Sequence, residues 1–332
     1  MTGASFASQD PGSGVTRNAD GSLTITASTF ENRNLRIPAQ FIGIANNRLF
    51  GQEQRGSSIY HSLQASLTHR FSDGLYFQGA YTFAKSIDNG SGSSFQDELN
   101  GLLDFGDQFN ARDNRGLSDF DRKHRLVISY NWELPVRSWF GIEDKGLGRL
   151  VSGWSLNGIT TLQSGTPFNI FDSAAATLQD PEGQNALYKA TYTGGPILTT
   201  GNVHQRIDNF VNLGSFLAGG HCVNNQNQIV DCADASAVAA AIGNLGRNIF
   251  RGPFQTNHDL GIVKMTKLTE KTNIEFRAEF FNILNRPAFQ SPQAAGGALG
   301  NFGLVDVQSN DSSILATANR PRTIQFGLKL NF

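Results

Sequence analysis

Long apolar runs are absent from this chain of 332 residues. No stretch approaches the roughly 18 consecutive apolar residues that a transmembrane helix needs, and a mean hydropathy of −0.28 is too polar for a helical membrane protein. A formal net charge of −1 gives no basic footprint for nucleic acid and no polybasic membrane patch. The sequence therefore excludes a helical membrane protein, and we expect no nucleic-acid partner.

Enzyme motifs are missing as well. The chain contains no GxSxG, no HExxH and no phosphate-binding loop, so we expect no enzymatic activity and no cofactor. Its six histidines are scattered. His61 and Ser62 are adjacent, so they would point to opposite faces of a strand and cannot form a nucleophile–base pair there.

Glycine and phenylalanine are abundant, with 36 Gly and 25 Phe against only 2 Met, and this composition favours β architecture. Three segments alternate clearly. In "HRLVISYNWELP" the even positions from Leu126 to Leu134 are apolar, and in "NIEFRAEFFN" apolar residues alternate with Glu275, Arg277 and Glu279. Arg322–Phe332 alternates in the same way. Such a period of two predicts strands, because a helix would scatter these side chains around its axis.

Four further segments predict strands less clearly: Tyr60–Phe71, Leu75–Lys85, Gly153–Ser164 and His258–Lys267. In the last of these, Leu260 and Ile262 fall out of phase with Val263 and Met265. We therefore expect a β-bulge in that strand.

The connections alternate between short and long along the chain. Ser72–Gly74 and Leu268–Thr272 are short turns, whereas Ser86–Arg122, Gly165–Asn257 and Asn285–Pro321 are long. In a meander every second connection lies at the same end, so all the long loops share one end. Outer-membrane barrels have short periplasmic turns and long extracellular loops, and their spanning strands contain about 9–11 residues. A soluble β-sandwich also shows alternation, but it does not confine long loops to one end.

The sequence therefore predicts an all-β fold: part of an antiparallel up-and-down transmembrane β-barrel in the bacterial outer membrane, with about seven to eight strands of a larger barrel. By phase, Glu275, Arg277 and Glu279 face the lumen. Phe332 would lie in the aromatic girdle at the periplasmic interface.

The long loops hold two further groups of candidate residues. Cys222 and Cys232 are the only cysteines, and their close spacing in an exported loop predicts a disulfide. A metal site with His221 is the competing interpretation, which the absence of CxxC spacing weakens. The loops either gate the barrel mouth or are solvated segments without a defined ligand.

The second group is a set of charges at the extracellular rim. It comprises Asp104, Asp107, Asp113, Asp119, Asp121, Arg112, Arg115, Arg122 and Arg125. These residues could bind a divalent cation, or lipopolysaccharide through bridging ions. No EF-hand spacing is present, so we expect a network of ion pairs and hydrogen bonds instead.

The chain resembles the C-terminal barrel region of TonB-dependent receptors, in particular the subgroup with an N-terminal carboxypeptidase-regulatory-like domain. The stretches that carry the resemblance are "SSIYHSLQASLTHRFSDGLYFQGAYTFAKSIDN", "GLSDFDRKHRLVISYNWELP", "GWSLNGITTLQSGTPFNI", "NIEFRAEFFNILNRPAF" and "NRPRTIQFGLKLNF". They follow one another in family order from Ser57 to Phe332. The ending, with Gln325, Gly327, Leu330 and Phe332, also looks like the signal read by the β-barrel assembly machinery.

The resemblance implies a receptor that imports a scarce nutrient and contacts the TonB complex through an N-terminal plug. The start "MTGASFASQDPGSG" lacks the basic and apolar regions of a signal peptide, and no plug or TonB box is readable in the chain. We therefore expect Met1 not to be the natural start and the chain to be the C-terminal part of a longer protein. Residues 1–56 would belong to an extracellular loop, and 57–332 to the barrel.

Two other interpretations remain open from the sequence. Gly21–Phe30 could supply an eighth strand that pairs with the last one, which would give a small self-contained barrel with an adhesive or structural role. A soluble all-β binding module is the second alternative. Under the main interpretation the partners are outer-membrane lipid, lipopolysaccharide and the assembly machinery.

Overall fold

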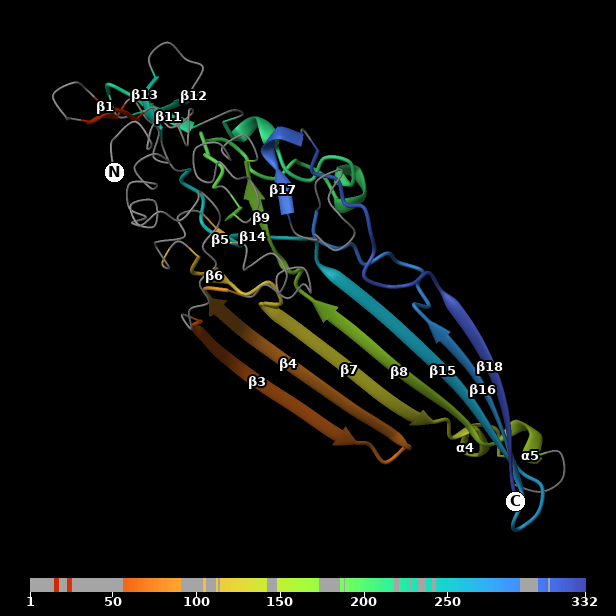
Figure 1. The fold of residues 1–332 in the computed structure, drawn as a ribbon. Helices are drawn as coiled ribbons and strands as arrows, with labels where there is room; N and C mark the ends of the chain where they lie inside the picture. The colour runs from red at the N-terminus through yellow and green to blue at the C-terminus, as the bar shows by residue number, and fades with distance from the viewer. Residues whose placement is uncertain are drawn as a thin grey trace, which may run out of the picture.

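The main element of the fold is one antiparallel sheet with seven long strands (Figure 1). The computed structural model describes residues 56–90, 112, 114–141, 148–172, 189–217, 221–226, 228–231, 237–240, 243–292, 304–309 and 311–332, and short strands at 15–17, 23–25, 104–105 and 186–187. In chain order the long strands are β3 (Ser58–Arg70), β4 (Leu75–Asp88), β7 (His124–Glu133), β8 (Trp154–Gln163), β15 (Gln255–Lys267), β16 (Asn273–Phe281) and β18 (Thr323–Asn331).

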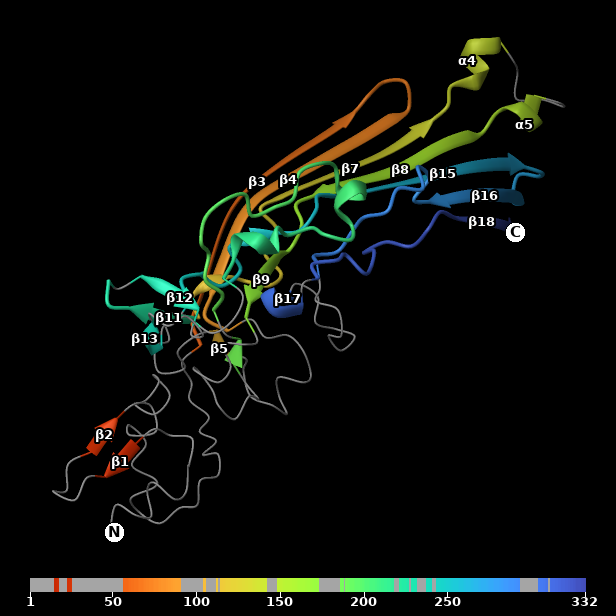
Figure 2. The ribbon, with the colours of Figure 1, turned by 90° about the horizontal axis from the view of Figure 1, so that it is seen from above.

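Each long strand pairs with its neighbours in the chain, which confirms the predicted up-and-down meander. The short strand β6 (Gly116–Leu117) extends the pairing at the end of β4. The sheet does not close on itself, so β3 and β18 are its two edges in the part of the chain that the structure describes. Figure 2 shows the strands side by side in a single bent layer.

The register sorts the side chains into two faces, because directly opposed residues on paired strands point the same way. One row crosses six strands through Leu75, Trp132, Leu156, Ile262, Ala278 and Phe326. The neighbouring row on the opposite face runs through Arg70, Tyr76, Asn131, Asn157, Gly261, Glu279 and Gln325. We call the face of the first row the outer face and that of the second the inner face.

The outer face carries large apolar side chains that are not covered. Leu63 is 66% exposed, Phe326 68% and Leu328 75%. Phe276 stacks on Phe326 with ring centroids 6.2 Å apart, so the aromatic contact lies within the face and not beneath a second layer. A soluble sheet would bury such residues against another layer. Uncovered apolar side chains along whole strands are the arrangement that a lipid environment favours.

The turns and the long connections lie at opposite ends of the strands (Figures 1 and 2). The short-turn end holds the C-terminus and two short helices, α4 (Val136–Phe140) and α5 (Gly148–Val151). Trp139 of α4 packs edge-on against Trp132 with ring centroids 5.8 Å apart, and Phe332 is 97% exposed. Aromatic residues therefore gather at this end, as they do at the interfaces of outer-membrane barrels.

Two details differ from the sequence-based expectations. The register of β15 with β8 and β16 runs without interruption, so the bulge predicted in His258–Lys267 is wrong. Leu260 and Ile262 simply face outward, while Val263 and Met265 face the polar inner side. The second difference concerns β2 (Leu23–Ile25), the described part of Gly21–Phe30. It pairs with β1 (Val15–Arg17) and not with β18.

The long loops contribute the compact part of the molecule, which we call the cap. Three of its small strands form one sheet: β9 (Pro167–Phe171), β14 (Phe250–Arg251) and β17 (Leu304–Asp306). A second small sheet pairs β5 (Asp104–Phe105) with β10 (Ala186–Leu187). In a third, β11 (His221–Asn224) pairs with β12 (Ile229–Asp231) and β13 (Ala237–Ala240). Within the described part of the cap, 3-10 turns lie at Val203–Arg206, Leu213–Ser215 and Val307–Ser309.

A hydrophobic core holds the cap together. Its buried members include Phe168, Ile170, Phe210, Val211, Phe216, Leu245, Phe289, Val305, Val307 and Ile314. They come from the two loops that follow β8 and β16. These connections are therefore packed against each other and are not merely solvated segments.

Among the described strands, Lys264 is the one lysine on the outer face near the short turns, and its surroundings shield its charge from lipid. The residue is only 8% exposed, and its ammonium donates hydrogen bonds to the carbonyl oxygens of Arg149, at 3.0 Å, and of Ser152. It also lies 5.8 Å from the ring centroid of Trp154. Gly153 next to it has φ +79°, and a Cβ there would lie 2.3 Å from the carbonyl oxygen of Met265. The α5 segment is thus anchored to β15.

We expect Lys264→Met to lower the free energy of unfolding in detergent by about 2 kcal/mol, because carbonyl oxygens at the end of α5 lose a charged donor. Lys271→Met is the control, since that side chain is exposed in the turn. Urea titration followed by tryptophan fluorescence measures both. Equal midpoints for the two variants would contradict the anchoring role of Lys264.

Candidate functional site

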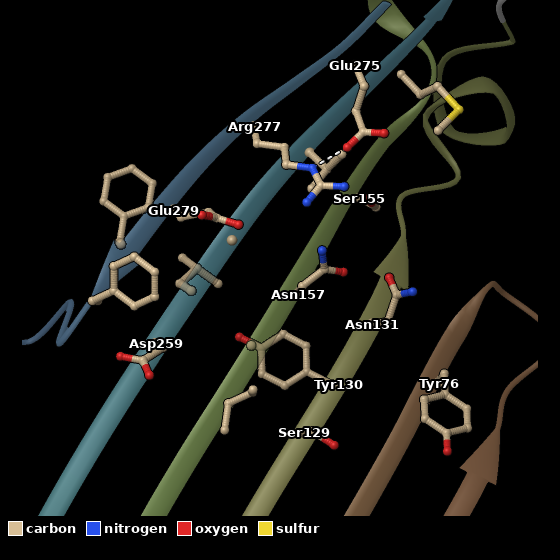
Figure 3. A pocket seen from close by; sticks show the side chains of 18 residues that line it. Tyr76, Ser129, Tyr130, Asn131, Ser155, Asn157, Asp259, Glu275, Arg277 and Glu279 are labelled. Carbon is tan, nitrogen blue, oxygen red and sulfur yellow. Dashed lines mark hydrogen bonds and ion pairs between the residues drawn. The ribbon is translucent and has the colours of Figure 1, made fainter. Parts of the chain in front are cut away.

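The inner face forms a polar hollow of about 630 Å³ (Figure 3). Apolar side chains line part of it, and its polar lining on the inner face includes Tyr76, Ser129, Asn131, Ser155, Asn157, Asp259, Glu275, Arg277 and Glu279. These residues come from five neighbouring strands, and the register brings them to one face. Amides, hydroxyls and charges over a surface of this kind fit a hydrated lumen and can offer hydrogen bonds to a polar solute.

The predicted lumen-facing charges lie together in this hollow. Glu275 is buried, and its carboxylate forms an ion pair with Arg277 in which Nε–H of the arginine donates the hydrogen bond. The Arg277 side chain is half exposed. Glu279 lies opposite Gly261 on β15 and Gln325 on β18. Arg277 faces Gly327 across the β16–β18 pair, and a Cβ on this glycine would lie 4.0 Å from the Cβ of Arg277, which is an ordinary contact. The hollow therefore combines acidic and basic groups on one strand.

A second group of charged residues joins the cap to the extracellular ends of the strands; we call it the rim network. Asp121 is 2% exposed, accepts from the backbone N–H of Ser86 at 2.5 Å and forms an ion pair with Arg251. Arg247 is 8% exposed and lies 2.7 Å from Asp88 and 3.2 Å from Asp119. Arg247 and Arg251 belong to the cap, whereas the aspartates that they contact, Asp88, Asp119 and Asp121, belong to the rim.

Hydrogen bonds extend the network on either side. Asn248, which has a left-handed backbone with φ 54°, donates from its side chain to the carbonyl oxygen of Leu117 at 2.7 Å. Arg122 donates to the carbonyl oxygen of Ser164 at 2.7 Å and to Gln255 at 2.9 Å. Burial lowers the pKa of the Arg122 guanidinium, and the neighbouring Arg125 and Arg251 lower it further, although arginine stays charged at neutral pH.

Sequence reasoning named some members of this network and missed others. Asp119, Asp121 and Arg122 lie within it, Arg125 is exposed on the inner face of β7, and Asp113 and Asp107 lie outside the described residues. Arg247, Asn248 and Arg251 were missed, because their partners lie about 130 to 160 residues away in the sequence. Among the described residues, no group of three or more histidine, cysteine or acidic side chains is placed to hold a metal ion.

The backbone at the rim approaches so closely that only glycine fits at certain positions. A Cβ on Gly116 would lie 2.4 Å from the carbonyl oxygen of Arg247, and one on Gly165 would lie 2.2 Å from that of Gly252. Both distances are far shorter than a normal contact. The loop segments and the strand ends are thus packed backbone against backbone.

Of the two cysteines, Cys222 lies on a small hairpin of the cap. Cys222 belongs to β11, which pairs antiparallel with β12, and His221 lies opposite Asp231. Cys232 follows directly after Asp231 but falls outside the described residues, so the disulfide stays a prediction. The residues of the predicted assembly signal all lie on or next to β18, with Gln325 and Gly327 on the inner face and Leu330 on the outer face.

These observations define the class of protein. A single antiparallel meander has an apolar outer face, a polar inner face, short turns at one end and long loops at the other, which is the anatomy of an outer-membrane β-barrel. Over residues 7–325 the sequence matches the family described as "outer membrane beta barrel domain", and the chain belongs to that family. It is accordingly a protein of the bacterial outer membrane, and the soluble-module interpretation is wrong. No curated protein and no solved structure matches the chain.

One negative finding accompanies the family match. Within the part of the chain that the structure describes, the helices are all too short or too polar to traverse a bilayer.

Replacing Arg247 with Met should loosen the cap and leave the sheet in place. The change leaves Asp88, which is 6% exposed, without its buried cation, and breaking such a pair costs about 3 kcal/mol. Hydrogen exchange at the amides of Phe168–Ile170 should then become about 100-fold faster while exchange in β7 and β8 stays unchanged. Arg320→Met, at an exposed residue of the same end, is the control. Unchanged protection in the cap would refute this role of Arg247.

The predicted disulfide has a direct test. Mass spectrometry of the protein digested without reductant should show the peptides of Cys222 and Cys232 linked. On reduction the summed mass of the two peptides should rise by about 2 mass units, because each thiol gains one hydrogen. Free alkylation of both thiols in unreduced protein would contradict the disulfide.

Proposed function

We propose that the chain forms the C-terminal part of the wall of a TonB-dependent receptor that imports a nutrient across the outer membrane. The observation that carries the proposal is the polar hollow on the inner face beneath a packed extracellular cap. A transport path needs hydrogen-bonding groups along the lumen and an entrance with a defined shape. The resemblance of the ordered strand motifs to such receptors supports the same role.

The proposed partners follow from this role. The TonB complex would act through an N-terminal plug, the β-barrel assembly machinery would read β18, and lipopolysaccharide would surround the extracellular half. We propose no enzymatic function, no cofactor and no nucleic-acid partner for the chain.

The alternative is a self-contained barrel with an adhesive or structural role. Its specific support was an eighth strand from Gly21–Phe30 paired with β18. The described part of that segment, β2, pairs with β1 instead. The transport proposal is therefore the stronger of the two.

Binding to TonB tests the proposal. The complete protein, extracted in detergent from the outer membrane of its source, is passed over the immobilised periplasmic domain of TonB. We expect it to be retained, and we expect retention to disappear when the segment upstream of the barrel is deleted. Arg277→Gln is the matched control, because it alters the inner wall without touching the plug, so it should be retained fully.

Two outcomes together would overturn the transport proposal. They are failure of the complete protein to bind TonB, and recovery of residues 1–332 alone as a heat-modifiable barrel. That result would instead favour the self-contained barrel.

A further inference from the structure

The polar hollow of the inner face also carries large apolar side chains that are open to water. Ile159 is 51% exposed, Met265 45% and Phe281 43%, and all three line the hollow. The register places them on the inner face, because Ile159 lies opposite Ser129 and Met265 opposite Glu275. Exposed apolar groups gathered in a concave site, next to a few polar groups, indicate contact with a solute that is partly apolar.

Glu279 offers its carboxylate to such a solute. It is half-buried, and it forms no hydrogen bond or ion pair with another described residue. Gly261 lies between Asn157 and Glu279 in the register, and a Cβ on Gly261 would meet Asn157 only at 3.7 Å or more. Asp259, two residues before Gly261, is a diagonal neighbour of Glu279. Backbone, and no side chain, therefore separates the Asn157 amide from two carboxylates (Figure 3).

Arg277 presents the opposite charge on the same strand and the same face. Its Nε–H donates to Glu275, whereas its two Nη groups donate to no other described residue and the side chain is half exposed. Side chains two residues apart on a strand lie about 7 Å apart, which is the spacing of Arg277 and Glu279. Among the described lining residues, Asp259, Glu275 and Glu279 outnumber the one guanidinium, so the hollow as a whole is negative.

A short peptide matches these groups. It carries an ammonium and a carboxylate, and two extended residues span about 7 Å, which is the spacing of the two opposite charges on β16. Its peptide groups need both donors and acceptors, which the directly opposed amides of Asn131 and Asn157 supply. A neutral sugar would leave Glu279 without a charged partner, and a simple amine would leave the Nη groups of Arg277 unused.

We propose that the hollow binds short peptides that have a free amino terminus and apolar side chains. The ammonium contacts Glu279 close to Asp259, the carboxylate accepts hydrogen bonds from the Nη groups of Arg277, and apolar side chains lie against Met265 and Phe281. Such binding rests on the proposed transport function, because a peptide reaches the inner face only through the lumen. It gives the unidentified nutrient a chemical class.

Titration calorimetry on the complete protein, extracted in detergent, tests the site with four probes. They are the dipeptide leucyl-phenylalanine, its N-acetyl derivative, its C-terminal amide and the neutral sugar maltose. We expect the free dipeptide to bind at least tenfold more tightly than the N-acetyl derivative, which lacks the ammonium. Amidation should weaken binding by a smaller factor, because the hollow is negative. Maltose should bind more weakly than the dipeptide.

Two variants assign the contacts to individual side chains. Glu279→Gln should weaken binding of the dipeptide about tenfold and leave the N-acetyl derivative unchanged. Arg277→Gln should weaken binding of the dipeptide and leave its amide unchanged. Arg125→Gln is the control, since Arg125 is exposed on the inner face of β7 but does not line the hollow. If Arg277→Gln fails to fold because Glu275 loses its cation, Glu279→Gln decides.

Three results would overturn the peptide site: equal affinity for the free and the N-acetylated dipeptide, tighter binding of maltose, or wild-type affinity in Glu279→Gln. The titration does not involve TonB, so its result is distinct from that of the TonB retention experiment. Retention by TonB without peptide binding overturns the peptide site and leaves the transport function standing. Peptide binding without retention supports the site and overturns the transport function.

Discussion

Hydrocarbon offers no hydrogen-bond partner to a peptide group, and this constraint governs the sheet. Every long strand between the edges is paired on both sides over most of its length. With the backbone satisfied, the alternation of side chains decides which environment each face meets. Leu156 and Asn157 are neighbours in sequence, yet one faces outward beside Trp132 and the other lines the polar hollow beside Asn131. A shift of one residue would exchange the two faces along the strand.

The same constraint explains where the charges lie. A charged group in contact with lipid is costly, so charges occur on the inner face, at the rim or under a local cover. Glu275 and Arg277 neutralise each other in the hollow, and Lys264 is covered by carbonyl oxygens at the end of α5. At the rim, Arg247 and Arg251 of the cap meet Asp88 and Asp121. These buried pairs fix the position of the cap relative to the strands, because either partner alone would be an uncompensated charge.

The sequence predicts the local and periodic parts of this architecture well. The strand positions and the inward direction of Glu275 and Glu279 follow from a period of two, and the position of the long loops follows from connection lengths. The cap could not be predicted in the same way. Phe168, Phe210 and Val305 share a core although they lie far apart in irregular segments, and no periodicity marks them. Arg247 and Asp88 are 159 residues apart, so only the fold brings them together.

The error in β15 has a physical cause. Because Val263 and Met265 are apolar, the hydrophobic pattern predicts that they face lipid. Since Leu260 and Ile262 are apolar too, the strand would then need a bulge to change its phase. The register shows that both face inward, opposite Arg277 and Glu275. An inner wall tolerates apolar side chains next to charged ones, because the aliphatic part of Arg277 can pack against them. Lipid, in contrast, does not tolerate unpaired charge. A charged residue in a strand therefore indicates the inner face more reliably than an apolar residue indicates the outer face.

The edges of the sheet are the last consequence of the constraint on the backbone. β3 and β18 each have one side without a partner among the described strands, and every residue of β3 is exposed. Each unpaired backbone group costs several kcal/mol in hydrocarbon, so a spanning edge with roughly ten such groups cannot persist in lipid. In the membrane these edges must be paired, with each other or with further strands. Pairing them with each other would bring β3 beside the C-terminal strand, whereas further strands would keep the two apart. The neighbours of β3 therefore determine the size of the lumen.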